Sequence, residues 1–208
     1  MQTSLEAISE TITPEIIEQA DDYITHHQKI ADLFKLGRTT NEDNREIMLN
    51  YTKMYLQRVG RWDKRGKLDS ELTDKLEELP RKMIWLVLNE GWCGDAAQTL
   101  PFIYKMAEAS DNITLKIILR DENLEVMDEF LTNGARSIPK LIALDEETLE
   151  VLGTWGPRPT EAYEMYKTER EDPDIPNEKA VENLHLWYAK DKGKSMQQEF
   201  LSLLDEWM

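Results

Sequence analysis

The sequence has little cysteine: Cys93 is the only one among 208 residues. A single cysteine can form no disulfide within the chain, so a disulfide-stabilised scaffold is excluded. A lone thiol also fits a reducing compartment, where disulfides rarely persist. The cysteine count therefore favours a cytoplasmic protein.

Long hydrophobic runs are missing as well. The longest one, residues 83–88, is far too short to span a bilayer. The first four residues are polar, without the basic and apolar regions of a secretion signal. We therefore expect a cytoplasmic protein that does not associate with a membrane.

Positive charge is also scarce, because 25 basic residues face 41 acidic ones and leave a net charge of −16. Such a field repels phosphate backbones, so nucleic-acid binding is not expected. His26, His27 and His185 lack metal-ligand spacing with Cys93. No glycine-rich phosphate loop occurs either. We expect neither a metal nor a cofactor.

The first eighty residues have the apolar periodicity of helices. One helix is predicted from Thr13 and Pro14 to Gly37, and a second from near Asn41 to Gly60. A shorter helix, in residues 72–79, stops at a proline. Residues 1–80 are therefore predicted to form a helical extension that packs on the rest of the chain.

Strand and helix patterns alternate in the next ninety residues. We predict strands at residues 83–88, 113–119, 140–144 and 148–153. The predicted helices are residues 95–109 with an interruption at Pro101, 122–131, 160–168, 177–190 and 195–207. A strand–helix–strand unit implies parallel pairing, and the last two strands suggest an antiparallel hairpin. The fold class is therefore α/β, with a mixed sheet and flanking helices.

Three motifs in this part of the chain belong together. Trp92-Cys93-Gly94-Asp95 follows the first strand and opens a helix, a proline lies eight residues after Cys93, and Ile138-Pro139 precedes the third strand. This combination resembles the thioredoxin-like superfamily, in particular a bacterial branch with a Trp-Cys-Gly-Asp motif and a helical N-terminal extension. The resemblance implies a thioredoxin-like domain over residues 81–208, including its helical tail.

The resemblance also implies a site around Cys93. Cys93 is the catalytic candidate, because a cysteine at a helix N-terminus faces unpaired N–H groups that favour the thiolate. Pro139 is then a cis proline facing the cysteine, and the Ile138 backbone pairs with a bound peptide. The substrate-binding residues implied in this way are Trp92, Gly94, Asp95, Ile138 and Pro139.

The sequence departs from the family pattern at three positions. Ala96 occupies the position of the second cysteine, which releases the bound substrate in two-cysteine members. Val87 lies where the family has a buried aspartate. Asp95 replaces a common proline; its carboxylate could cap the helix, and its charge opposes thiolate formation. Ordinary two-cysteine thioredoxin activity is therefore not expected.

Three interpretations remain open. In the first, Cys93 performs monothiol exchange with a protein or small-molecule disulfide, and an external thiol completes the reaction. In the second, the chain is an inactive thioredoxin-fold module that binds a protein or peptide. In the third, Cys93 reduces or senses peroxide, which needs a nearby cation, and Arg136 and Arg158 are the candidates. Aromatic residues in the tail, such as Trp187 and Trp207, leave a homodimer open.

Overall fold

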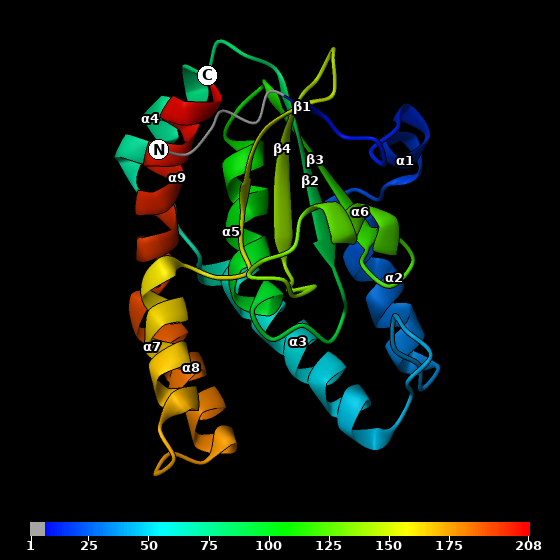
Figure 1. The fold of residues 1–208 in the computed structure, drawn as a ribbon, viewed down its shortest axis with the longest axis vertical. Helices are drawn as coiled ribbons and strands as arrows, with labels where there is room; N and C mark the ends of the chain where they lie inside the picture. Colours follow the sequence, from blue (N-terminus) through cyan, green and yellow to red (C-terminus); the bar gives the residue numbers. More distant parts are fainter. Residues whose placement is uncertain (1–6) are drawn as a thin grey trace.

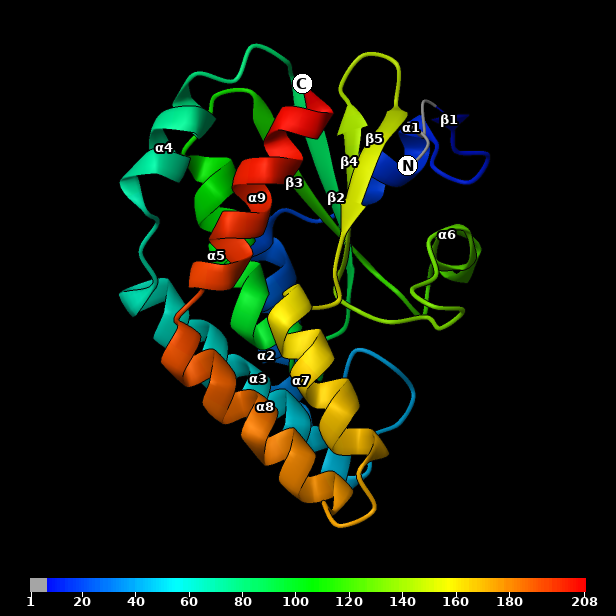
Figure 2. The ribbon, with the colours of Figure 1, turned by 60° about the vertical axis from the view of Figure 1, so that its left-hand side comes forward.

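The computed structural model describes residues 7–208, so the polar start of the chain, including residues 1–4, lies outside the described residues. A five-stranded sheet organises the molecule (Figure 1), and its strands lie in the order β1-β5-β4-β2-β3 (Figure 2). The strands are β1 (Ala7–Ile8), β2 (Met83–Asn89), β3 (Ile113–Leu119), β4 (Lys140–Asp145) and β5 (Glu150–Trp155).

Strand β2 lies inside the sheet and is buried along its whole length. It pairs in parallel with β3 and antiparallel with β4, with Val87 opposite Ile117 on one side and Leu141 on the other. Strand β5 continues the antiparallel half of the sheet. The predicted α/β fold with a mixed sheet is confirmed.

The helices cover both faces of this sheet. In both views α5 and α9 lie on one side, whereas α1 and α6 lie on the other (Figures 1 and 2). The helices are α1 (Pro14–Gln19), α2 (Tyr23–Lys35), α3 (Glu46–Arg65), α4 (Ser70–Glu77), α5 (Ala96–Glu108), α6 (Leu124–Glu129), α7 (Thr160–Glu171), α8 (Asn177–Asp191) and α9 (Lys194–Trp207). Among residues 7–208, no helix has the length and apolar character that a membrane crossing requires.

The main hydrophobic core joins segments from both ends of the chain. It includes Ile30 of α2, Tyr55 of α3 and Phe200 of α9, together with the buried side chains of the sheet. The predicted helical extension therefore shares its core with the α/β part. Helices α7 and α8 behave differently, because they bury Ala162, Leu184 and Tyr188 in a second, smaller cluster.

The first predicted helix is wrong as one continuous element, because it divides into α1 and α2. Asp21, between them, pairs with Ile117 at the free edge of β3; the two backbone hydrogen bonds are 2.9 and 2.8 Å long. Edge strands attract backbone partners, and this pairing interrupts the helix. Asp22 then caps α2 by accepting a hydrogen bond from the Thr25 N–H at 2.8 Å.

Other elements also differ from the prediction: α6 is shorter than residues 122–131, and β5 is shifted from residues 148–153. Helix α3 begins at Glu46, not near Asn41, because Asn41 and Thr39 bond to each other in the preceding turn. It continues through Gly60 to Arg65. Helix α5 is not interrupted at Pro101, since a proline removes only one helical hydrogen bond and the surrounding side chains are buried. The short strand β1 was not predicted.

Candidate functional site

Cys93 lies in the turn between β2 and α5. The apolar run of β2 ends at Asn89, and the Cys93 N–H donates to the Glu90 carbonyl at 3.1 Å, which closes the turn. The cysteine is only 6% exposed. Its Sγ donates to the Ile138 carbonyl at 3.2 Å and accepts a hydrogen bond from the Ala96 N–H at 3.4 Å. The thiol is therefore placed between the start of α5 and the Ile138–Pro139 segment.

Burial controls the protonation of this thiol. Desolvation raises the pKa of Cys93 to about 12, and the nearby Asp95 charge acts in the same direction. The Ala96 and Asp95 amides and the Arg158 guanidinium oppose this rise, but their effects are smaller. The expected benefit of the helix N-terminus is present, yet it is outweighed, and Cys93 is a neutral thiol near pH 7.

Asp95 is buried beside the cysteine and contacts two residues from the C-terminal half of the chain. It accepts a hydrogen bond from Arg158 Nη2 at 2.5 Å and one from the Tyr188 hydroxyl at 2.8 Å. Burial raises the pKa of Asp95, whereas the Arg158 charge lowers it. The carboxylate makes no capping bond to α5, so the predicted capping role is wrong.

Helix α8 covers the outer side of this turn. A Cβ atom added at Gly94 would lie 3.1 Å from His185 Cε1 and 3.6 Å from Arg58 Nη1, so glycine permits the close approach of α8 and α3. The His185 ring is also 3.4 Å from Gln98 Nε2. Burial lowers the pKa of His185 to about 4, which keeps the imidazole neutral.

The Ile138–Pro139 bond is cis, as the family resemblance implies, and both residues are buried. The Gly156–Pro157 bond, also cis, lies against it. A Cβ at Gly156 would lie 2.2 Å from the Pro139 carbonyl oxygen, and its φ of +117° also requires glycine. The turn that leads to Arg158 therefore lies against the Pro139 backbone, while the neighbouring Ile138 carbonyl accepts the hydrogen bond from Cys93.

Trp92 lies on the more open side of the turn and is half-buried. The Arg120 guanidinium lies over its ring, 5.1 Å from the centroid. Arg120 Nη1 also donates to the Arg136 carbonyl at 3.3 Å. Cation–π contact of this kind orients the indole, so Trp92 forms a defined surface beside the buried cysteine.

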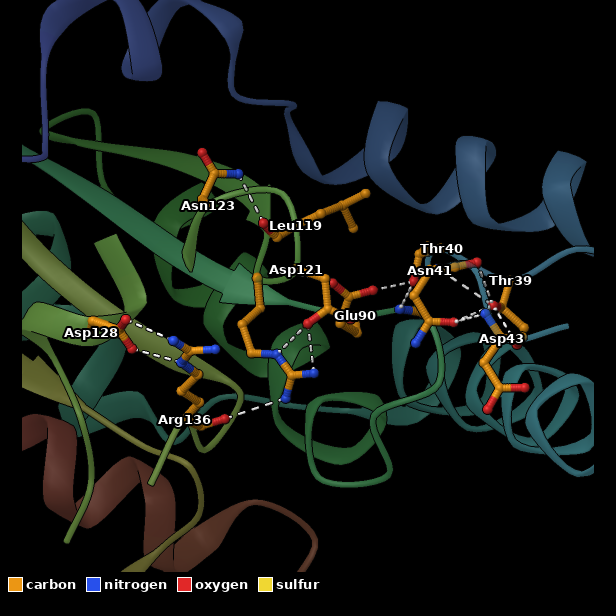
Figure 3. Close-up of polar contacts among 12 residues, drawn as sticks. Thr39, Thr40, Asn41, Asp43, Glu90, Leu119, Asp121, Asn123, Asp128 and Arg136 are labelled. Carbon is orange, nitrogen blue, oxygen red and sulfur yellow. Dashed lines mark hydrogen bonds and ion pairs between the residues drawn. The ribbon is translucent and has the colours of Figure 1, made fainter. Parts of the chain in front are cut away.

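Glu90 is a buried carboxylate that the sequence interpretation missed. It accepts a hydrogen bond from the Thr40 hydroxyl and another from the Asp121 N–H at 3.0 Å. Figure 3 shows it between the turn of Thr39–Asp43 and the Arg136–Asp128 pair. Burial is the main reason that the pKa of Glu90 rises to about 7. The only sequence clue was an acidic residue directly after a buried strand.

The structure brings several predicted site residues together. Cys93, Asp95, Ile138 and Pro139 are neighbours through the contacts above, while Gly94 faces α8 and Trp92 lies next to them. Of the two arginines considered as cations for the thiol, Arg158 is close to the site but binds Asp95. Arg136 binds Asp128 at the surface, with an Nε–Oδ1 distance of 2.6 Å.

His185 and Tyr188 were not predicted as site residues. They are far from Cys93 in the sequence, and their helical pattern gave no indication of their contacts. Within residues 7–208, no three histidine, cysteine or acidic side chains are grouped as metal ligands. A cavity of about 590 Å³ lies elsewhere, between α2 and β3, where His26, Ile30 and Ile118 contribute to its lining.

Comparison with known proteins agrees with the observed fold. A family model described as Thioredoxin matches residues 41–171. No curated protein matches the chain. A Pseudomonas aeruginosa protein of unknown function is 21% identical, with a TM-score of 0.58, covering 92% of this chain and 95% of that one. A crystal structure of an HIV epitope scaffold is 20% identical, with a TM-score of 0.54 and coverages of 92% and 96%.

The two solved structures show the fold alone, because their sequence identities are low. The family model shows family membership as well, because its match includes more than half of the chain and spans both Cys93 and the cis Pro139. The chain therefore belongs to this thioredoxin family.

Proposed function

We propose that this chain is a thioredoxin-fold module that binds a protein or peptide partner and does not catalyse disulfide exchange. The observation that carries the proposal is the state of Cys93, which is buried and donates a hydrogen bond to the Ile138 carbonyl. A thiol that acts as a donor is protonated. The nucleophile of thiol–disulfide exchange is the thiolate.

The chemistry of the site supports this proposal in two ways. Burial raises the pKa of Cys93 to about 12, so the thiolate that would attack a disulfide is scarce at pH 7. Ala96 supplies no second thiol, so a mixed disulfide at Cys93 cannot be released from within the chain. Both features remove steps that a two-cysteine enzyme needs.

The accessible part of this face is suited to binding. Trp92 is half-buried and held by Arg120, and residues 133–136 are exposed before the chain enters the buried Ile138–Pro139 segment. Aromatic and arginine side chains are enriched at protein interfaces. A partner is expected to contact Trp92 and this exposed loop rather than the Cys93 sulfur.

The test is the pH profile of Cys93 alkylation by iodoacetamide, measured on the native chain and on the urea-unfolded chain. Cys93→Ser is the matched blank, because it removes the only thiol. We expect a native rate that is negligible near pH 7, with any midpoint above that of the unfolded chain. A native midpoint below the unfolded one contradicts the proposal.

Monothiol exchange is the second candidate function, and one observation favours it. The Ala96 N–H donates to Sγ, and the Arg158 charge lowers the pKa of Cys93, so a thiolate would have stabilising neighbours. The Cys93 thiolate would attack a disulfide, form a mixed disulfide and release one thiolate. An external thiolate would then attack the mixed disulfide and free Cys93.

Ala96→Cys should confer disulfide-reductase turnover if this candidate is right, and should confer none if the binding proposal is right.

A further inference from the structure

The α7–α8 hairpin, residues 160–191, is packed as a separate unit. Its buried side chains, Ala162, Leu184 and Tyr188, form their own cluster, against which Met165, Tyr166 and Trp187 pack. None of these residues belongs to the main core. In Figure 2 the hairpin projects below the sheet at the end where α5 begins. Because these apolar side chains pack against one another, they stay buried if the hairpin moves as a rigid body.

The contacts between the hairpin and the Cys93 turn are mostly polar. Tyr188 donates to Asp95, and His185 lies against Gly94 and Gln98. Arg158, just before the hairpin, binds the other Asp95 oxygen. The Arg158 guanidinium also lies 4.7 Å from the centre of the Tyr166 ring in α7. This cation–π contact keeps Arg158 with the hairpin when the hairpin separates from Asp95.

The strength of these polar contacts is partly offset by burial. Removing Asp95 and Arg158 from water is costly, and an opened site regains their hydration. The net cost of separating them is therefore well below the strength of the pair in isolation. Opening also loses little apolar contact, because the apolar clusters lie on either side of the seam.

The two ends of the hairpin have backbone conformations that suit pivots. Gly156 has a φ of +117° before the hairpin, and Lys192 and Gly193 have φ values of 59° and 82° after it. Domain and lid motions concentrate at a few element-terminal residues that absorb the change of backbone angle. Gly156 and Gly193 are also held against Pro139 and Phe102, which fixes where the pivots lie.

We propose that the α7–α8 hairpin is a hinged cover over Cys93, and that the contacts of Tyr188 and Arg158 with Asp95 are its latch. In the closed state the cover buries the thiol; in the open state it exposes Cys93, Gly94 and Asp95 together. The inference goes beyond the proposed function, because a covered face can serve either a binding partner or an exchange reaction.

The experiment measures the rate at which an aromatic disulfide reagent, 5,5′-dithiobis(2-nitrobenzoate), labels Cys93 at increasing urea concentrations. Since Cys93 is the only thiol, the whole signal reports this site. Global unfolding is followed in parallel by tryptophan fluorescence. Because the urea slope scales with the exposed surface, labelling through an opened cover should show a much shallower slope than global unfolding.

Tyr188→Phe removes the latch hydroxyl and leaves the ring. A hydrogen bond to a charged group corresponds to roughly a 10- to 100-fold change in the opening constant, so labelling should accelerate by about that factor. Tyr163→Phe is the matched control, because it is on the same hairpin and removes a hydrogen bond that is exposed. Its hydroxyl accepts from Asn133 Nδ2, outside the hairpin, at 2.7 Å, and water replaces such a surface bond at little cost. Its labelling rate should stay within about twofold of the wild type.

The cover is overturned if the labelling rate of the wild-type chain has the same urea slope as global unfolding. It is also overturned if the labelling rate without urea is no faster than global unfolding alone would allow. Equal effects of Tyr163→Phe and Tyr188→Phe overturn the latch. The wild-type slope needs no variant, so poor folding of Tyr188→Phe does not remove the test. The pH midpoint tests the proposed function and the urea slope tests the cover, so either can fail alone.

Discussion

Helices α8 and α9 follow each other along the chain, yet they serve different parts of the molecule. Both are amphipathic and aromatic, and only the Lys192–Gly193 turn separates them. Phe200 of α9 packs against Trp85 and Trp155, with ring centroids 5.3 and 5.5 Å apart. Leu184 of α8 packs only in the small cluster of the hairpin.

An apolar helix face therefore does not by itself specify which element it packs against. Helix α9 packs against β5 and contributes Phe200 to the aromatic cluster of the main core, so it is expected to support global stability. Helix α8 covers a polar turn and buries its apolar residues against α7 instead. We therefore expect the two helices to differ in their contribution to global stability, and the predictions below test that difference in order of expected effect.

Phe200→Ala should have the largest effect. Its ring is fully buried between tryptophans, so its removal leaves a cavity in the main core and should lower the free energy of unfolding by about 3–5 kcal/mol. Urea denaturation followed by circular dichroism measures this change. A loss below about 1 kcal/mol would show that α9 is as loosely attached as the hairpin.

Glu90→Gln tests the buried carboxylate that precedes the Cys93 turn. The quantity to compare is the pH dependence of the free energy of unfolding. The folded-state pKa of Glu90, about 7, lies above its ordinary value of 4.5. Folding therefore favours the protonated form, and stability falls as the pH rises from about 4.5 to 7. Glutamine removes this penalty, so the variant should be more stable by about 1–3 kcal/mol at pH 8 and nearly equal to the wild type at pH 4.5.

The measurement is the difference in urea midpoint between the two chains at both pH values. A difference that does not change with pH would mean that Glu90 is not a buried titrating group. Glu122→Gln is the control, because this carboxylate is exposed and its loss should change stability by less than about 0.5 kcal/mol.

Leu184→Ala should have the smallest global effect of the three, about 1–2 kcal/mol, which is at or below the usual range for a buried leucine. The reason is that the hairpin can separate without unfolding the sheet, so part of the lost packing is not felt by the main core. Cys93 labelling should accelerate at the same time. A loss as large as that of Phe200→Ala would remove the distinction between the two regions.

The local features of the site could be predicted from the sequence, although its environment could not. The Trp92-Cys93-Gly94 turn and the Ile138-Pro139 segment were recognisable because each is a short motif next to a strand. The α/β fold followed from the alternation of strand and helix patterns. The division of the first helix at Asp21 was missed, since it depends on the edge of β3, almost a hundred residues away.

The available chemistry follows from the amino-acid sequence alone: one thiol, no second cysteine at Ala96 and no titratable group at Val87. The protonation state of that thiol depends on the tertiary structure. The pKa of Cys93 depends on desolvation by distant segments and on the charge of Asp95. Asp95 in turn is held by Arg158 and Tyr188. Burial and Coulomb interactions depend on distances in space, which no local sequence pattern records.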